Sequence, residues 1–234
     1  MNFAIKMFAD GADLEQIQQL SMNPLVSGYT TNPSLMRKAG VENYERFAKD
    51  ALSIIKGQPI SFEVLSDDLE GMVIQAKKIS LWGDNIFVKI PITNSQSTST
   101  ESVIHELGKE GISVNVTAVL TVNQVEKIAK SLNKATKNVV SFFAGRVADT
   151  GVDPIPMVRE IKKIQEAEKN FELLWASPRE ILNLIQAENE KCEIITMTSD
   201  LWKKIDSLGK NLETFSLETV QMFLDDALDS KFEI

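Results

Sequence analysis

Lys89 has the clearest chemical potential of any residue in this 234-residue chain, because it stands inside an apolar run. Its neighbours within Phe87–Pro91 are all apolar. A lone lysine in a strand ordinarily faces solvent, but burial of an unpaired ammonium is costly unless the group loses its proton or gains partners. A lysine held in an apolar strand is therefore a candidate nucleophilic amine, able to attack a carbonyl carbon.

Two carboxylates stand at the ends of other strand-like runs. Asp10 ends the first run and Glu63 ends the third. Carboxylates can carry protons for an amine nucleophile only if the fold places them beside it. Both residues also suit a structural role as N-caps of the helices that follow, and for Asp10 the two interpretations are evenly matched.

Hydrogen-bonding side chains fall late in most of the other apolar runs. Strand side chains alternate between two faces, so residues two apart share a face. In a closed parallel barrel such positions surround one pocket at the carboxyl ends of the strands, where barrel enzymes keep their chemistry. Thr30 and Asn32 could instead organise a turn around Pro33. The residues concerned are Thr30 with Asn32, Asn115 with Thr117, Ser141 with Phe143, and Ser177 at the end of the seventh run.

Phosphate recognition would have to come from a few placed cations, because the chain is acidic overall. The net charge of −8 and pI near 4.9 argue against nucleic acid or an anionic membrane as a partner. Ser177 and Arg179 flank Pro178 at a predicted helix start, where a cation beside free backbone N–H groups can bind an anion. The same residues also suit a plain helix start with Pro178 in the first turn.

Composition narrows the class of protein further. Hydrophobic residues make up 43% and charged residues 25%, as in soluble globular proteins. The single cysteine, Cys192, excludes an internal disulfide, and no apolar run is long enough to span a bilayer. The N-terminal segment turns acidic too soon for a signal peptide, so we expect a cytoplasmic protein. With one histidine, His105, and one cysteine, neither a metal site nor a cofactor motif is expected.

Eight short apolar runs alternate with longer amphipathic stretches. This alternation predicts an α/β protein with a parallel sheet closed into one (β/α)8 TIM barrel. An open doubly wound sheet is the alternative, but no glycine-rich turn follows the first run. The strand-like runs are Phe3–Ala9, Leu25–Thr31, Pro59–Leu65, Asn85–Ile92, Ser113–Leu120, Asn138–Ala144, Glu172–Ser177 and Glu193–Thr198, and the helical candidates include Asn43–Ile55, Leu69–Lys78, Val122–Leu132, Pro156–Glu166 and Arg179–Glu188.

One more amphipathic helix follows the eighth unit, over about 217–229. Its apolar residues recur at helical spacing along one stripe. We expect residues 1–234 to form a single barrel domain that carries this helix as an oligomerisation element. The stripe consists of Leu217, Val220, Phe223, Leu224 and Leu228.

Five segments, in order along nearly the whole chain, resemble the transaldolase family. The resemblance implies a (β/α)8 barrel, a lysine Schiff base, sugar-phosphate substrates, no cofactor, and a place in the carbohydrate metabolism of the pentose phosphate pathway. The segments are Gly28–Leu35, with its threonine–threonine–asparagine–proline–serine run, the lysine strand Val88–Pro91, Asn115–Thr117, Ser141–Arg146, and the phosphate element Ala176–Arg179.

Residue by residue, this resemblance implies specific roles. Lys89 would form an imine with the C2 carbonyl of a ketose. Asp10 would take the hydroxyl proton as the C3–C4 bond breaks, and Glu63 would shuttle protons together with Thr117 and a water. Substrate binding would fall to Thr30, Asn32, Asn115, Ser141 and Phe143 around the dihydroxyacetone unit, and to Arg146, Ser177 and Arg179 at the phosphate.

Two positions favour sugar transfer over simple cleavage within this resemblance. Simple aldolases of the family typically carry glutamine and tyrosine where this chain has Glu63 and Phe143. The chain length and C-terminal segment resemble the small transaldolases, which include fructose-6-phosphate aldolases and form pentamers and decamers, so we expect a homo-oligomer. Tyr29 and Trp175 depart from the family pattern, which leaves the donor and acceptor sugars open. The alternatives are a fructose-6-phosphate aldolase or a related ketose-phosphate aldolase, and a barrel that only binds sugar phosphates.

Overall fold

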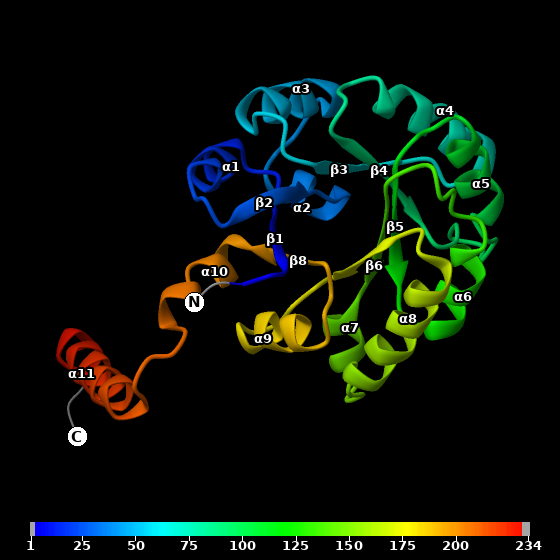
Figure 1. Cartoon of the computed structure of the whole chain (residues 1–234). Coiled ribbons are helices and arrows are strands. Elements are labelled where there is room, and N and C mark those ends of the chain that lie inside the picture. The colour runs from blue at the N-terminus through cyan, green and yellow to red at the C-terminus, as the bar shows by residue number, and fades with distance from the viewer. Residues whose placement is uncertain (1–2, 231–234) are drawn as a thin grey trace. The chain divides into compact units, whose positions relative to one another are not determined.

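The computed structural model describes residues 3–230, and the chain divides between Trp202 and Lys203 into two compact units. In the first unit, eight parallel strands form a closed barrel in sequence order, with helices around its outside (Figure 1). The predicted (β/α)8 barrel is confirmed. The strands are β1 (Lys6–Asp10), β2 (Val26–Thr30), β3 (Ile60–Glu63), β4 (Ile86–Pro91), β5 (Val114–Val119), β6 (Asn138–Phe142), β7 (Glu172–Trp175) and β8 (Ile194–Thr198).

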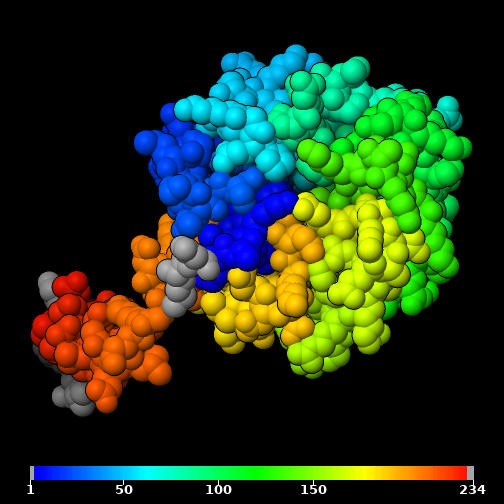
Figure 2. Space-filling model, in the orientation of Figure 1, coloured from blue at the N-terminus to red at the C-terminus, as the bar shows by residue number. Residues whose placement is uncertain are grey.

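The barrel closes where β1 pairs with β8. Their register runs from Lys6 beside Ile194 to Asp10 beside Thr198. Figure 2 shows the corresponding contact, with N-terminal residues in blue against residues in yellow and orange from the last barrel units. Closure places the last residues of all eight strands around one mouth, so Asp10 and its counterparts on the other strands meet there.

Each strand observed lies within its predicted run, except that β1 is shifted. The first run was predicted to begin at Phe3 and end at Ala9, whereas β1 ends at Asp10. The backbone N–H groups of Ala4 and Ile5 donate to the carboxylate of Glu188 rather than to a neighbouring strand. This side-chain contact explains the later start of β1, and it could not be seen in the local pattern.

Some of the helices, α4 among them, begin after a residue whose side chain caps them. Asp68 accepts from the backbone N–H of Gly71 and caps the fourth helix, and Ser66 donates to that carboxylate. The helices of the barrel unit are α1 (Leu14–Ser21), α2 (Pro33–Lys38), α3 (Tyr44–Ile54), α4 (Leu69–Ser80), α5 (Glu101–Lys109), α6 (Val122–Ala129), α7 (Ala144–Ala148), α8 (Ile155–Glu168), α9 (Leu182–Asn189) and α10 (Ser199–Trp202).

The predicted helix start at Pro178 is wrong. Helix α9 begins at Leu182, and Ser177 before the proline has a left-handed backbone with φ of 57°. The backbone N–H groups of Arg179 and Glu180 donate instead to the side chain of Asn183. The Ser177 loop is thus held open by a side-chain acceptor rather than wound into the helix.

An apolar cluster fills the middle of the barrel between its two mouths. Phe8 lies two residues before Asp10 on β1, so both side chains point into the barrel. The Phe8 ring occupies the space beside Gly28, where an added Cβ would lie 2.5 Å from the ring. The cluster consists of Phe8, Val139, Leu174, Ala176 and Ile194, with Phe87 and Phe143 packed against it.

The second unit contains a short 3-10 helix, Ile205–Ser207, and the long helix α11, Leu212–Ser230. The C-terminal helix was predicted to begin at Leu217, five residues too late. Asn211 accepts from the backbone N–H groups of Glu213 and Thr214 and starts the helix earlier. None of the α11 side chains is buried. Within residues 3–230, no helix is both long enough and apolar enough to cross a membrane.

Candidate active site

Lys89 lies near the end of β4 and is 6% exposed. Its Nζ donates to the backbone carbonyl of Thr31 at 2.8 Å and lies 3.1 Å from Oε2 of Glu63. The register of β3 and β4 places Glu63 directly beside Lys89. The amine therefore has a base within hydrogen-bond distance, which offsets the cost of its burial.

Asp10 joins this group from the end of β1. Burial raises the pKa of its carboxyl, the nearby charge of Glu63 adds to the rise, and the charge of Lys89 and a hydrogen bond from Thr30 oppose it. Asp10 ends β1, Glu63 ends β3 and Lys89 lies beside Glu63, so the three predicted catalytic groups lie at the same mouth of the barrel. A carboxyl whose pKa is raised above its ordinary value holds a proton more readily, which suits a group that accepts and returns one.

A relay of hydroxyls supports Asp10. Thr30 donates from Oγ1 to Oδ1 of Asp10 at 2.7 Å, and Oγ1 of Thr196 lies 2.6 Å from Oγ1 of Thr30. A hydroxyl has one proton, so Thr196 must donate to Thr30. Thr196 was not predicted from the sequence. It lies two residues before Thr198, at the end of β8, and the alternation that identified the other strands could have found it.

A second relay holds Asn115 on β5. Its Oδ1 accepts from Oγ of Ser141 at 2.7 Å, and its Nδ2 donates to Oγ of Ser61 at 3.0 Å. All three side chains are buried. Ser61 was also missed in the sequence, although it stands two residues before Glu63 and so shares its face of β3. The two hydroxyls fix the orientation of the Asn115 amide.

Thr117 presents a polar atom without a partner. It is 2% exposed, and no group within residues 3–230 forms a hydrogen bond with its Oγ1. A buried hydroxyl without a partner is destabilising, and such groups concentrate where a ligand or reaction uses them. Thr117 faces Pro91, two residues beyond Lys89, in the register of β4 and β5. This position favours its predicted part in proton transfer.

Asn32 has the structural role that the sequence left open. Its Oδ1 accepts from the backbone N–H of Leu35 at 2.9 Å and caps α2. The cap uses only this oxygen and leaves the Nδ2 group of the same amide outside it. The backbone carbonyl of the preceding residue, Thr31, accepts from Lys89, so the same turn shapes the lysine site.

The predicted phosphate residues form a separate group beyond β6 and β7. Exposed Arg146 lies over the ring of Phe143, 5.8 Å from its centroid. Arg179 forms a two-point ion pair with Asp149, with Nε donating at 3.0 Å. Gly145 brings the two loops close, because a Cβ there would lie 1.6 Å from the carbonyl of Ser177. The pairing of Arg179 with Asp149 was not predicted, and a phosphate would have to replace that carboxylate.

His105 lies exposed on α5. Across residues 3–230, no group of three or more histidine, cysteine, aspartate or glutamate residues could hold a metal ion. The carboxyl mouth of the barrel gathers a buried amine, two carboxyls and a set of hydroxyl and amide side chains.

The fold and the site together define a (β/α)8 barrel with a buried lysine beside a carboxylate at its carboxyl mouth. Residues 7–234 match the family model described as transaldolase/fructose-6-phosphate aldolase. The chain belongs to this family.

Similar proteins from several organisms carry related names. A "Probable transaldolase" of Methanococcus vannielii is 35% identical over 202 residues, covering 86% of this chain and 89% of the relative. A "Probable transaldolase" of Nitrosopumilus maritimus is 36% identical over 206 residues, covering 86% and 87%. A "Probable transaldolase 2" of Listeria monocytogenes is 34% identical over 218 residues, covering 90% and 94%. These likenesses support an enzyme of the aldolase/transaldolase type.

Proposed function

We propose that this protein is a transaldolase that moves a dihydroxyacetone unit from a ketose phosphate to an aldose phosphate through a Schiff base on Lys89. The observation that carries the proposal is the burial of Lys89 beside Glu63, with the raised-pKa carboxyl of Asp10 within electrostatic reach. A buried amine with two adjacent proton carriers has the parts that imine chemistry needs.

The first half of the reaction forms the imine. The neutral amine of Lys89 attacks C2 of the ketose, and Glu63, 3.1 Å away, takes the proton that the ammonium must lose. The carbinolamine then expels water, whose oxygen comes from the substrate carbonyl. Glu63 supplies the proton for that oxygen, and the unpartnered hydroxyl of Thr117 orients the leaving water.

The second half breaks and remakes a carbon–carbon bond. Asp10 takes the proton of the C4 hydroxyl as the C3–C4 bond breaks, the aldose leaves, and the bonding electrons pass into the imine to give an enamine. The enamine then attacks the carbonyl carbon of an acceptor aldose, and Asp10 returns its proton to the new hydroxyl. A carboxyl whose pKa burial raises can both hold and release this proton.

Binding of the three-carbon unit falls to the polar relays. Ser141 and Ser61 fix the amide of Asn115, whose second N–H has no partner within residues 3–230 and can donate to a substrate hydroxyl. Thr30 holds Asp10, and Asn32 offers its Nδ2. At the far end, Arg146, Ser177 and Arg179 would hold the substrate phosphate. The Arg179–Asp149 pair is about half exposed, so exchanging the carboxylate for a phosphate costs little.

Simple cleavage of fructose 6-phosphate is the second candidate, because the matching family description names both activities. The half-buried ring of Phe143 favours transfer, since it offers no proton to the enamine. A coupled assay separates the two functions. For transfer, glyceraldehyde 3-phosphate should appear from fructose 6-phosphate only when erythrose 4-phosphate is supplied. Release of the same amount of glyceraldehyde 3-phosphate without erythrose 4-phosphate would instead establish aldolase activity.

The assembly and location of the protein follow the same resemblance. We propose a homo-oligomer, a pentamer or decamer, with α11 as the contact element, because this helix carries an apolar stripe and has no buried residue. A cytoplasmic location fits the buried thiol of Cys192, whose pKa burial raises to about 12. Light scattering of the chain and of a Leu217→Glu, Phe223→Glu variant tests the assembly, since the variant should be smaller.

A further inference from the structure

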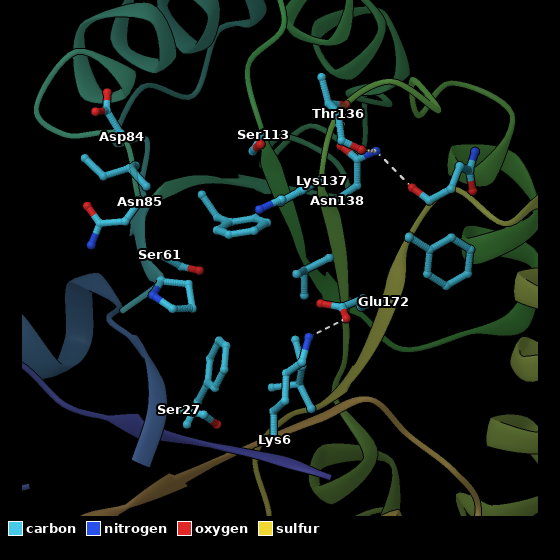
Figure 3. Close-up of a pocket in the computed structure, with 18 of the residues that line it drawn as sticks. Lys6, Ser27, Ser61, Asp84, Asn85, Ser113, Thr136, Lys137, Asn138 and Glu172 are labelled. Carbon is cyan, nitrogen blue, oxygen red and sulfur yellow. Dashed lines mark hydrogen bonds and ion pairs between the residues drawn. The ribbon is translucent and has the colours of Figure 1, made fainter. Parts of the chain in front are cut away.

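A cavity of about 1060 Å³ opens at the amino ends of the strands (Figure 3). Its walls include Lys6, Ile86 and Glu172, each the first residue of its strand. Asp10 and Glu63 are the last residues of their strands. Because the strands are parallel, the cavity lies at the mouth opposite the catalytic group, and none of the predicted site residues lines it.

Small side chains keep this mouth open. The amino mouth of a (β/α)8 barrel usually serves stability and is packed. Here Ser61 and Ser113 occupy wall positions on the third strand and immediately before the fifth, and neither fills the space. The volume is of the size that ligand sites have.

The charge of the lining is opposite to that of the chain. Four lysines and two carboxylates line the cavity, in a protein with a net charge of −8. Lys6 and Glu172 form an ion pair at 2.5 Å and neutralise each other. Lys134 lies 3.9 Å from Glu168. A local excess of cations inside an acidic molecule attracts small anions to that point.

Two of the lysines have no partner of opposite charge. Among residues 3–230, neither Lys137 nor Lys169 forms an ion pair, and both are exposed. Figure 3 shows the side chain of Lys137 reaching into the cavity, whereas Lys6 turns to Glu172. The two unpaired ammonium groups are therefore the ones available to an anion.

The rest of the wall is suited to the uncharged part of a ligand. Phe87 is half-buried and presents a ring at the wall, and Phe171 adds a second apolar surface. Asn170, also in the wall, donates from Nδ2 to the carbonyls of Ala129 and Leu132, but its buried Oδ1 has no donor within the described residues. An acceptor without a donor fits a ligand that carries N–H groups as well as a flat ring.

From these observations we infer that the amino mouth of the barrel is a second binding site, for an organic phosphate that carries a flat ring. The phosphate is attracted by Lys137 and Lys169, and the ring lies against Phe87. The site is separate from the imine chemistry, because the apolar cluster around Phe8 lies between the two mouths.

Binding of adenosine monophosphate, measured by calorimetry at low salt, tests this inference. Wild-type protein should bind one equivalent per chain, and more tightly than it binds either adenosine or inorganic phosphate. The double variant Lys137→Gln, Lys169→Gln should bind about tenfold more weakly or worse, because charge-assisted contacts are lost. The matched control Lys38→Gln, Lys127→Gln removes the same charge from two exposed lysines outside the cavity and should bind as the wild type does.

Two further arms keep the result independent of variant folding and of the catalytic site. Adenosine monophosphate should protect Lys137 and Lys169, but not Lys38, from reductive methylation followed by mass spectrometry. The Arg179→Ala variant should bind adenosine monophosphate as tightly as the wild type does. Weaker binding by this variant would indicate that the nucleotide binds at the predicted phosphate residues of the carboxyl mouth instead. Absence of binding, equal binding by the Lys137 and Lys169 variant, or loss with Arg179→Ala would each overturn the inference and leave the proposed transaldolase function untouched.

Discussion

The two mouths of the barrel hold charged residues in opposite ways. At the carboxyl mouth, Lys89 is 6% exposed and is matched by Glu63 and a backbone carbonyl. At the amino mouth, Lys137 and Lys169 are exposed and form no ion pair within residues 3–230. Charges interact strongly where water is excluded and weakly where it is not. The groups at the carboxyl mouth can therefore exchange protons during a reaction, whereas the lysines at the amino mouth can only attract and bind an anion.

The physical separation of the mouths comes from the filling of the barrel. Phe8, beside Gly28, and its apolar neighbours occupy the middle of the interior. Ser61 belongs to both regions, because it lines the amino cavity and accepts from Asn115. Apart from changes at Ser61, changes confined to one mouth should leave the other nearly unaffected, because the apolar filling lies between them.

Replacement of Asp10 should have the largest effect among them. Asp10→Asn removes the proton carrier for C–C cleavage, and loss of a general acid/base typically lowers kcat by roughly 10²- to 10⁴-fold. Binding of adenosine monophosphate at the amino mouth should be unchanged. Steady-state kinetics with a ketose and an aldose phosphate gives the first number, and calorimetry gives the second. Retention of near wild-type kcat would remove Asp10 from the mechanism.

Replacement of Arg179 should affect phosphorylated substrates selectively. A charge-assisted hydrogen bond contributes about 1.5–3 kcal/mol to binding. The Arg179→Ala variant should therefore bind phosphorylated substrates roughly 10- to 150-fold more weakly. Unphosphorylated dihydroxyacetone and glyceraldehyde should be almost unaffected. Asp149→Asn serves as the control, because it frees Arg179 from its ion pair and should not weaken phosphate binding. An equal loss for both substrate types would make Arg179 structural.

Replacement of Thr196 should shift a pH profile by a smaller amount. Thr196→Val removes the donor that polarises Thr30, and Thr30 then stabilises the Asp10 carboxylate less well. The pKa of Asp10 should rise further, and the acidic limb of kcat/KM should move to higher pH. Thr196→Ser keeps the hydroxyl and should restore the wild-type profile. A profile that moves equally in both variants would show that only packing had changed.

The smallest expected effect is on stability. Burial raises the pKa of Asp10 in the folded state. Above the ordinary pKa of an aspartate, the unfolded chain gives up this proton more readily than the folded chain does, so folding loses stability as pH rises through the raised value. Asp10→Asn should thus be more stable than the wild type at pH 7, and the difference should shrink in acid. Urea unfolding at both pH values measures it, and a difference independent of pH would contradict the account.

Sequence patterns predicted the parts of this molecule that local chemistry decides. An apolar run around Lys89 indicated burial, and alternation placed Glu63 and Asn115 on the inner face. Ser61 and Thr196 were missed although alternation places them on the inner faces of their strands, because the hydrogen-bond partner of a single hydroxyl depends on strand register. The pair of Arg179 with Asp149, 30 residues apart, depends on tertiary structure. The starts of α9 and α11 were missed for a different reason, because each is decided by a local side-chain acceptor, Asn183 or Asn211, that the apolar pattern does not reveal.

Chemical trapping at Lys89 tests the central claim most directly. Borohydride added together with fructose 6-phosphate should inactivate the protein and leave a reduced three-carbon adduct on the peptide that contains Lys89. Lys89→Met should show no adduct and should retain its fold by circular dichroism. One adduct per chain is expected, at Lys89 alone. An adduct on another lysine, such as Lys137, or none with any ketose phosphate, would contradict it.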